Sequence, residues 1–310
     1  MNLIKTTSKT NPLYVGEFRS QQECAHLTAN FRKSFPDEIT SVNIKRSVIQ
    51  NLLDNENVSG IRFMYGLGDK NDAASRVIIL MPCNFTMQGN IPNVIFNKSG
   101  FYTHNGDMIS LDDACGKQVN HVFRMKSQNP EIAYTKILRG YFLGKAGLLE
   151  LINRVTDEYV SYNFGYDITS NSTLKPVIRS IDGDDDGLDH GKLCPPDTDC
   201  GMESDITCVA TYVAEYYAAN KEGELNILRG FRDIVLNENL ASAAIEKYYT
   251  ISASIMEQLY KDVAKTEVAQ TLYHNYFKTS VASLVADDKA QAFRIFEECM
   301  QYLTDKYLYQ

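Results

Sequence analysis

The residues best suited to chemistry lie close together in the second half of the chain. His190, Cys194, Cys200 and Cys208 supply one imidazole and three thiols, a ligand set that zinc accepts. A zinc ion bound by them would order a segment that has few apolar residues of its own. However, the five residues between Cys194 and Cys200 exceed the two to four that are usual between zinc ligands. We therefore favour an unliganded loop anchored by the Pro195–Pro196 pair, with structural zinc as the alternative.

A second candidate metal site begins just before this set. Asp182, Asp184 and Asp186 alternate along the chain and are followed by a glycine, which matches the first half of a calcium-binding loop. The second half does not match. Its ninth position is His190 and its twelfth is Leu193, where a calcium loop places an oxygen ligand and a bidentate glutamate. The sequence therefore favours a solvated acidic loop over a calcium site.

One cysteine of the zinc set is also a candidate nucleophile. Cys208 lies at the expected start of a helix, where the N-terminal backbone groups favour the thiolate. Catalysis would also need a base, and His190 and His274 are the histidines in this half of the chain. No sequence spacing brings either of them to Cys208. A metal- or cysteine-dependent enzyme or effector centred on this segment is the alternative to a non-enzymatic protein.

The net charge of the chain comes from one segment. Residues 181–205 contain nine acidic residues and one basic residue, which accounts for the whole net charge of −8. The rest of the chain is neutral and has no basic excess of the kind that nucleic acids require. We therefore expect no nucleic-acid partner. Residues 161–205 are interpreted as an acidic connector, containing Cys and Pro, between two domains.

The remaining composition is typical of a globular protein of the cytoplasm. The chain has 310 residues, 44% of them hydrophobic and 23% charged, which is enough for two domains. Its first residues contain no apolar run like that of a signal peptide, and no window reaches the roughly 18 apolar residues of a membrane span. The seven cysteines, an odd number, are typical of reduced thiols. Zinc, and after it calcium, are the cofactors that the sequence suggests.

The elements expected before the connector begin with two helices and a hairpin. Ser20 and Glu23 form a capping box that starts a helix, and a second helix is expected from about Val42. The β-rich runs 60–65 and 76–81 flank a turn-forming stretch and predict an antiparallel hairpin.

The rest of the chain is expected to be mainly helical. Asn129 and Pro130 are typical of a helix start, so a long helix is expected from there to about residue 155. After residue 206 the apolar residues recur at helical spacing, as in the stripe Val209, Tyr212, Val213, Tyr216 and Tyr217. The predicted fold class is therefore an α+β domain with a small antiparallel sheet over residues 1–160, followed by an all-α bundle over residues 206–310.

Part of the bundle resembles a known family. The segments Cys208-Val-Ala-Thr-Tyr-Val-Ala, Glu224-Leu-Asn-Ile-Leu-Arg-Gly-Phe-Arg-Asp233 and Lys247-Tyr-Tyr249 resemble the CFI-box C-terminal domain of uncharacterised bacterial proteins, over about residues 206–262. The Phe-Ile pair that follows the family's cysteine is not kept after Cys208. More loosely, the N-terminal helices and hairpin with Cys194-Pro-Pro196 are similar to hypothetical Bacteroidetes proteins. The resemblance implies a bacterial origin and a domain that recurs at the C-termini of different proteins.

The charged residues of that motif are Arg229, Arg232 and Asp233. On a helix Asp233 can pair with Arg229 four positions earlier, and Arg232 has the geometry to clamp a carboxylate. A structural ion pair between helices is the interpretation that we favour. Since no catalytic set is complete, we expect a non-enzymatic protein-interaction or assembly protein, whose bundle docks onto a partner protein or self-associates.

Overall fold

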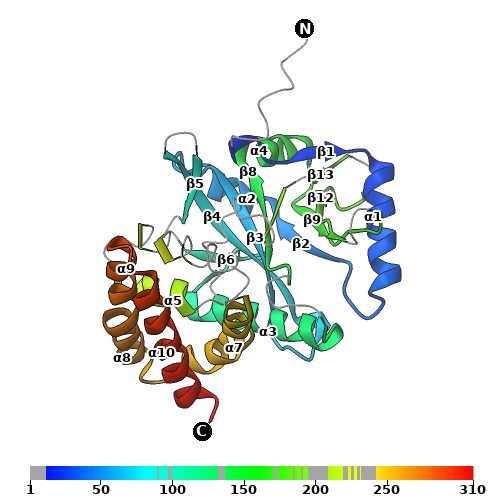
Figure 1. Ribbon diagram of the computed structural model, residues 1–310. Helices are drawn as coiled ribbons and strands as arrows, with labels where there is room; N and C mark the ends of the chain where they lie inside the picture. The colour runs from blue at the N-terminus through cyan, green and yellow to red at the C-terminus, as the bar shows by residue number, and fades with distance from the viewer. Residues whose placement is uncertain are drawn as a thin grey trace. The chain divides into compact units, whose positions relative to one another are not determined.

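The chain divides into two compact units. Unit 1 consists of Met1–His121 and Leu138–Met202, and unit 2 of Val122–Ile137 and Glu203–Gln310. The computed structural model describes residues 12–88, 91–96, 100–131, 137–169, 173–183, 186–189, 191–194, 209–218, 223–224, 227–228, 231 and 242–309. Among these, the strands belong to unit 1, and the orange and red helices of Figure 1 belong to unit 2. None of the described helices is both long and apolar enough to cross a membrane.

The first sheet of unit 1 has five antiparallel strands in the order β1-β13-β12-β9-β2. Their bounds are Glu17–Arg19 for β1, Ser41–Lys45 for β2, Tyr159–Asn163 for β9, Val177–Arg179 for β12 and Gly187–Asp189 for β13. Along β2 the side chains alternate, with Val42 and Ile44 buried and Asn43 exposed between them. One face of this sheet is therefore a core face. A separate pair is formed by β10 (Tyr166–Asp167) and β11 (Thr173–Leu174).

The second sheet of unit 1 has seven strands in the order β14-β8-β3-β4-β6-β7, with β5 also paired to β4. Their bounds are Gly60–Leu67 for β3, Arg76–Gln88 for β4, Ile91–Phe96 for β5, Phe101–Thr103 for β6, Met108–Ile109 for β7, Gly140–Gly144 for β8 and Lys192–Cys194 for β14. All eight residues of β3 are buried, including Arg62 among its apolar neighbours. Short 3₁₀ turns lie at Pro12–Tyr14 (η1) and Ala73–Ser75 (η2).

Both sheets and the helices α1 (Gln21–Ser34), α2 (Arg46–Leu53) and α4 (Lys145–Arg154) contribute to one core. The first part of α3 (Leu111–Gln128) also belongs to unit 1. In the core, Phe63 of β3 packs 5.6 Å from Tyr162 of β9, measured between ring centroids. Ile49 of α2 and Leu151 of α4 belong to the same buried cluster. The two sheets of unit 1 thus face each other across shared apolar side chains.

The secondary-structure elements that the structure describes in unit 2 are helical, and they include the last part of α3. The other described helices of unit 2 are α5 (Val209–Tyr217), α7 (Ser242–Leu259), α8 (Lys265–Leu272), the π-helical turn η6 (Tyr273–Phe277), α9 (Lys278–Val285) and α10 (Lys289–Tyr307). The last three segments before α10 follow one another without a break, so a π turn interrupts one continuous helix. Asp288 caps α10 by accepting a hydrogen bond from the Gln291 backbone N–H.

The predicted fold class is wrong. Instead of a small sheet followed by a bundle, the first two thirds of the chain build antiparallel sheets of five and seven strands, with helices towards the C-terminus. The sequence pattern missed several strands because they are two or three residues long, too short to show an apolar period. Five of them, β10 to β14, lie between residues 166 and 194, where the sequence suggests a connector.

Two of the expected helices are also incorrect in their extent. The helix expected over residues 129–155 is interrupted by Gly140–Gly144, which form the buried strand β8, and α4 starts only at Lys145. A short apolar run fits a buried strand and a helix equally well, and the tertiary pairing of β8 with β3 decides it here. Likewise Val42 lies in β2, and the second helix starts at Arg46.

Three local predictions are confirmed. Ser20 and Glu23 form the capping box at the start of α1. The runs at 60–65 and 76–81 pair as an antiparallel hairpin whose register joins Gly60 to Cys83 and Leu67 to Arg76. In the expected stripe of α5, Val209, Tyr212 and Val213 are buried.

A close backbone approach makes Gly165 a test of this packing. A Cβ atom at position 165 would lie 2.2 Å from the carbonyl oxygen of Lys175 and 3.0 Å from the Leu27 Cβ. We expect Gly165→Ala to lower the free energy of unfolding by about 2–3 kcal/mol, because backbone has to move to admit the methyl group. Urea denaturation measures this change. Gly68→Ala is the matched control, since its nearest neighbour would be the Ser75 Cβ at 3.4 Å. Equal midpoints for the two variants would contradict the packing described here.

Candidate functional site

A buried polar network holds the place where the chain crosses from one sheet to the other. The strand β13 ends at Asp189 in the five-stranded sheet, and β14 starts at Lys192 in the seven-stranded sheet. The side chain of Asp189 is fully buried. A carboxylate in such a place requires charge and hydrogen-bond partners, because burial alone strongly disfavours its ionised form.

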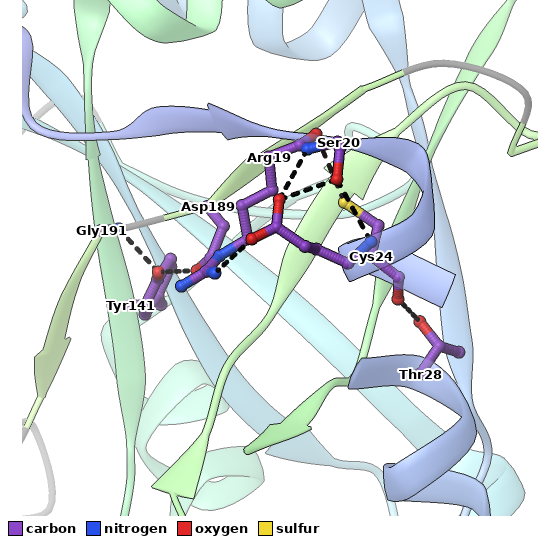
Figure 2. A network of polar contacts seen from close by, with 8 residues as sticks. Arg19, Ser20, Cys24, Thr28, Tyr141, Asp189 and Gly191 are labelled. Atoms are coloured by element: carbon purple, nitrogen blue, oxygen red, sulfur yellow. Dashed lines mark hydrogen bonds and ion pairs between the residues drawn. The ribbon is translucent and has the colours of Figure 1, made fainter. Parts of the chain in front are cut away.

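The two partners of Asp189 come from two different strands of unit 1, β1 and β8. Arg19 Nε donates to Asp189 Oδ2 as an ion pair, and the Tyr141 hydroxyl donates to Asp189 Oδ1 over 2.5 Å. The Gly191 backbone N–H in turn donates to the Tyr141 hydroxyl oxygen over 2.6 Å. Figure 2 shows these four residues converging from β1, β8 and the crossover. We call Arg19, Tyr141, Asp189 and Gly191 the crossover clasp.

The strand registers bring these residues together. Arg19 lies opposite Gly187 in the β1–β13 pair, so Asp189 is its diagonal neighbour two positions further along β13. On the other sheet, Tyr141 of β8 lies opposite Leu193 of β14. A Cβ atom at Gly191 would lie 2.4 Å from Tyr141 Cε1 and 2.5 Å from the Phe142 carbonyl oxygen. The crossover therefore needs glycine at position 191 to lie against the tyrosine ring.

The start of helix α1 is attached to the same network. Glu23, which completes the capping box, has a carboxylate oxygen 3.7 Å from Arg19 Nη1. The Cys24 thiol donates to the Arg19 carbonyl oxygen over 3.7 Å, and Thr28 Oγ1 donates to the Cys24 carbonyl oxygen over 3.0 Å (Figure 2). Cys24 is fully buried, and a Cβ atom at Gly187 would lie 2.8 Å from its Sγ. The clasp thus fixes α1 against β13.

The electrostatics of the clasp favour a fixed structural arrangement. Burial, and then the neighbouring Asp189 carboxylate, raise the pKa of the Tyr141 hydroxyl well above its usual value. For Arg19, burial acts to lower the pKa of the guanidinium, but the attraction of Asp189 outweighs it and the pKa rises. Tyr141 therefore stays protonated and Arg19 stays charged at neutral pH. Neither side chain can exchange a proton with a substrate there.

A second buried polar cluster lies in unit 1, formed by Glu38, Arg76 and His121. Arg76 Nη2 and the Glu38 carboxylate form an ion pair with both side chains almost fully buried. Arg76 Nη1 lies 3.4 Å from His121 Nδ1, and His121 Nε2 lies 2.9 Å from the Leu138 carbonyl oxygen. Since a guanidinium only donates, Nδ1 is the acceptor and the proton of the neutral ring is on Nε2.

This histidine is poorly suited to act as a general base. Burial, and then the positive charge of Arg76, lower the pKa of the His121 imidazole to about 3. The aromatic ring of Tyr65 meets it edge-on at 5.4 Å between centroids. An efficient general base titrates near the working pH and reaches its substrate, and His121 is buried within the fold.

Four of the described cysteines, Cys24, Cys83, Cys115 and Cys299, have buried side chains. Burial raises the pKa of Cys83 and of Cys299 to about 12 and also raises that of Cys24. A thiol that stays protonated is a weak nucleophile. These four side chains act as small apolar residues of the packing.

The structure leaves most of the residues selected from sequence untested. His190, Cys200, Cys208, Asp184 and the motif residues Arg229, Arg232 and Asp233 lie outside the described residues. Cys194 ends the backbone of β14, while Asp182 and Asp186 are exposed. Asp182 Oδ1 accepts a hydrogen bond from Ser180 Oγ over 2.6 Å. Within the described part of the chain, no three or more His, Cys, Asp or Glu side chains are grouped so as to hold a metal ion.

Sequence reasoning missed the role of Asp189, which it counted among the acids of a solvated segment. A weak signal was present, because the apolar Leu188 and Leu193 interrupt an otherwise polar run on either side of Gly191. Arg19 and Tyr141 could not be connected to it, since they lie 170 and 48 positions away in the chain. Only the pairing of strands brings these residues into contact.

The comparisons with known proteins add no constraint on this site. No protein-family model, no curated protein and no solved structure matches the chain. The resemblance to the CFI-box domain therefore stays a prediction, and function is argued from the geometry of the described residues.

The hydroxyl of Tyr141 is the group whose removal tests the clasp. We expect Tyr141→Phe to lower the free energy of unfolding by about 2–4 kcal/mol, because the Asp189 carboxylate and the Gly191 N–H both lose a buried partner. Chemical denaturation followed by circular dichroism measures the loss. Tyr14→Phe removes a hydroxyl from an exposed side chain and serves as the control, with a change below about 0.5 kcal/mol. Equal losses in the two variants would show that the clasp does not stabilise the fold.

Proposed function

We propose that this protein acts by binding another protein, as a non-enzymatic interaction or assembly protein in the bacterial cytoplasm. The observation that carries the proposal is an apolar end on unit 2. The turn between α7 and α8 presents Val263 fully exposed, and Tyr309, just after α10, is 77% exposed. Large exposed apolar side chains are typical of protein-binding surfaces when they gather on a fixed support.

The support of these two side chains is a hydrogen-bonded turn. Asp262 Oδ1 accepts from the Ala264 backbone N–H over 2.8 Å, and Asp262 Oδ2 accepts from the Tyr307 hydroxyl over 2.8 Å. These hydrogen bonds, that of Ala264 first, lower the pKa of the Asp262 carboxyl, so it stays ionised at neutral pH. Asp262 precedes Val263 in the chain and Tyr307 lies two residues before Tyr309, so the contact holds both exposed side chains at the same end of unit 2.

The buried polar groups of unit 1 are consistent with the same proposal. The charges of Asp189 and Arg19, and those of Glu38 and Arg76, neutralise each other inside the fold. Such pairs are used to hold elements together, as in the clasp, and they leave these groups committed to structure. The proposal therefore assigns unit 1 to a supporting role and binding to the apolar end of unit 2.

If the apolar end of unit 2 binds proteins, charged side chains placed on it should prevent that binding. We expect the purified protein to form an oligomer, or to capture a partner protein from lysate of its host, and the double variant Val263→Lys/Tyr309→Lys to lose at least 90% of that association. Light scattering coupled to gel filtration, together with affinity capture and mass spectrometry, measures it.

The control for this experiment is Met108→Lys, which places the same charge at a 70% exposed apolar residue of unit 1. It should associate like the unaltered protein. A strictly monomeric protein that captures no partner, or a double variant that associates normally, would contradict the proposal.

A metal-dependent or cysteine-dependent role remains a second candidate, favoured by one observation. Tyr141 of the clasp holds the side chain of Asp189 and the backbone N–H of Gly191, and β14 continues from there to Cys194. One of the four zinc ligands suggested by the sequence, Cys194, thus lies on an anchored strand. Anchored ligands reduce the entropy cost of binding a metal ion.

Metal analysis decides between the two candidates. If the first proposal holds, protein purified without chelator should contain well under one equivalent of zinc or calcium by plasma mass spectrometry. A zinc content near one equivalent that is lost in His190→Gln and in Cys194→Ser would favour the second candidate. His26→Gln, at an exposed position of α1, is the matched control and should leave the metal content unchanged.

A further inference from the structure

The two points at which the chain passes between its units lie against each other in unit 1. The chain leaves unit 1 after His121 and returns to it at Leu138. The imidazole Nε2 of His121 lies 2.9 Å from the Leu138 carbonyl oxygen. His121, the last residue of unit 1 before residues 122–137, is therefore hydrogen-bonded to Leu138, the first residue of unit 1 after them and 17 positions later.

Two further hydrogen bonds fix the returning chain. The carbonyl oxygen of Arg139 accepts from the Gln118 side-chain amide over 3.1 Å and from the Tyr65 backbone N–H over 2.9 Å. Gln118 lies one turn before His121 on α3, so one face of that helix holds both Leu138 and Arg139. Tyr65 belongs to β3, in the buried centre of the seven-stranded sheet. Leu138 and Arg139, where the chain returns to unit 1, are thus attached to its core. We call these two residues the base.

The groups around His121 make this attachment sensitive to protons. Its Nδ1 accepts from the Arg76 guanidinium, and Arg139 is a second nearby positive charge, while Glu38 is the nearby negative charge. Tyr65 adds a neutral hydroxyl that stays protonated, because burial raises its pKa. A proton on Nδ1 would face the guanidinium N–H, so the contact would be lost and a third positive charge would be buried.

We propose that His121 is an acid-sensitive latch, which holds Leu138 and Arg139 against α3 and β3 within unit 1 while its Nδ1 is unprotonated and releases them when that nitrogen takes up a proton. The latch is a conformational device, and it does not depend on the protein-binding function proposed above. It acts where the chain returns to unit 1 after residues 122–137, which belong to unit 2.

The sign of the pH dependence follows from the protonation of the two states. In the closed state, burial and then Arg76 lower the pKa of His121 to about 3, while in an open state it returns towards about 6.5. The open state therefore binds one more proton between these two values, and the closed state is fully favoured above about pH 6.5. Within this window the opening equilibrium should rise about tenfold for each unit by which the pH falls.

Hydrogen exchange measured by mass spectrometry tests the latch. Peptides that contain Tyr65 and residues 137–141 report on the base, and peptides from β2 and β9 report on unit 1 as a whole. After correction for intrinsic exchange rates, we expect local opening at the base to rise about tenfold per pH unit between pH 6 and pH 4, before the strands lose protection. His121→Gln, which cannot be protonated, should abolish this slope.

The control is His26→Gln, which removes an exposed histidine from α1 and should keep the slope of the unaltered protein. The proposal would be overturned if His121→Gln kept the same slope, or if the base and the reference strands lost protection together. If His121→Gln does not fold, the comparison of base and reference peptides in the unaltered protein decides the question alone.

Discussion

The carboxylate of Asp189, buried where the chain passes from one sheet to the other, determines how the two sheets of unit 1 are joined. Its two oxygens are used by two different elements, one by Arg19 of β1 and the other by Tyr141 of β8. Because an unpaired buried charge is strongly unfavourable, these partners must be present together for the crossover to form. The arrangement of β1, β13 and β14 therefore depends on an interaction that apolar packing cannot replace without rebuilding the site.

Unit 1 contains two buried clusters in which an arginine pairs with a carboxylate. The clasp holds the crossover between β13 and β14. The ion pair of Arg76 with Glu38 lies beside His121, where the chain leaves unit 1. Both clusters consist of side chains from distant parts of the sequence, and both lie beside the apolar core shared by the two sheets. Buried polar groups of this kind specify which strands and helices meet, whereas apolar contacts are more tolerant of alternatives.

What the sequence could predict depended on how local the decisive interactions are. The capping box at Ser20 and the β3–β4 hairpin were predictable because their partners are close in the chain. The sequence of Gly140–Gly144 fits a helix and a strand equally well, and only the pairing with β3 distinguishes the two. Asp189 carries only a weak signal in a run of acids, the neighbouring Leu188 and Leu193, because burial and its distant partners define its role. The composition of the acidic segment therefore accounts for its exposed residues Asp182 and Asp186 but not for the buried Asp189.

The pairing of β1 with β13 has a consequence for the order of events during synthesis. Arg19 and Asp189 are 170 positions apart, so β1 has no strand partner until most of unit 1 has been translated. At about 5–20 residues per second, a ribosome needs roughly 10–30 s to cover that interval. The hairpin β3–β4 can form during this time, whereas Glu17–Arg19 must wait with their backbone groups exposed to water or to chaperones. In this protein the first strand of the chain is among the last to be incorporated into its sheet.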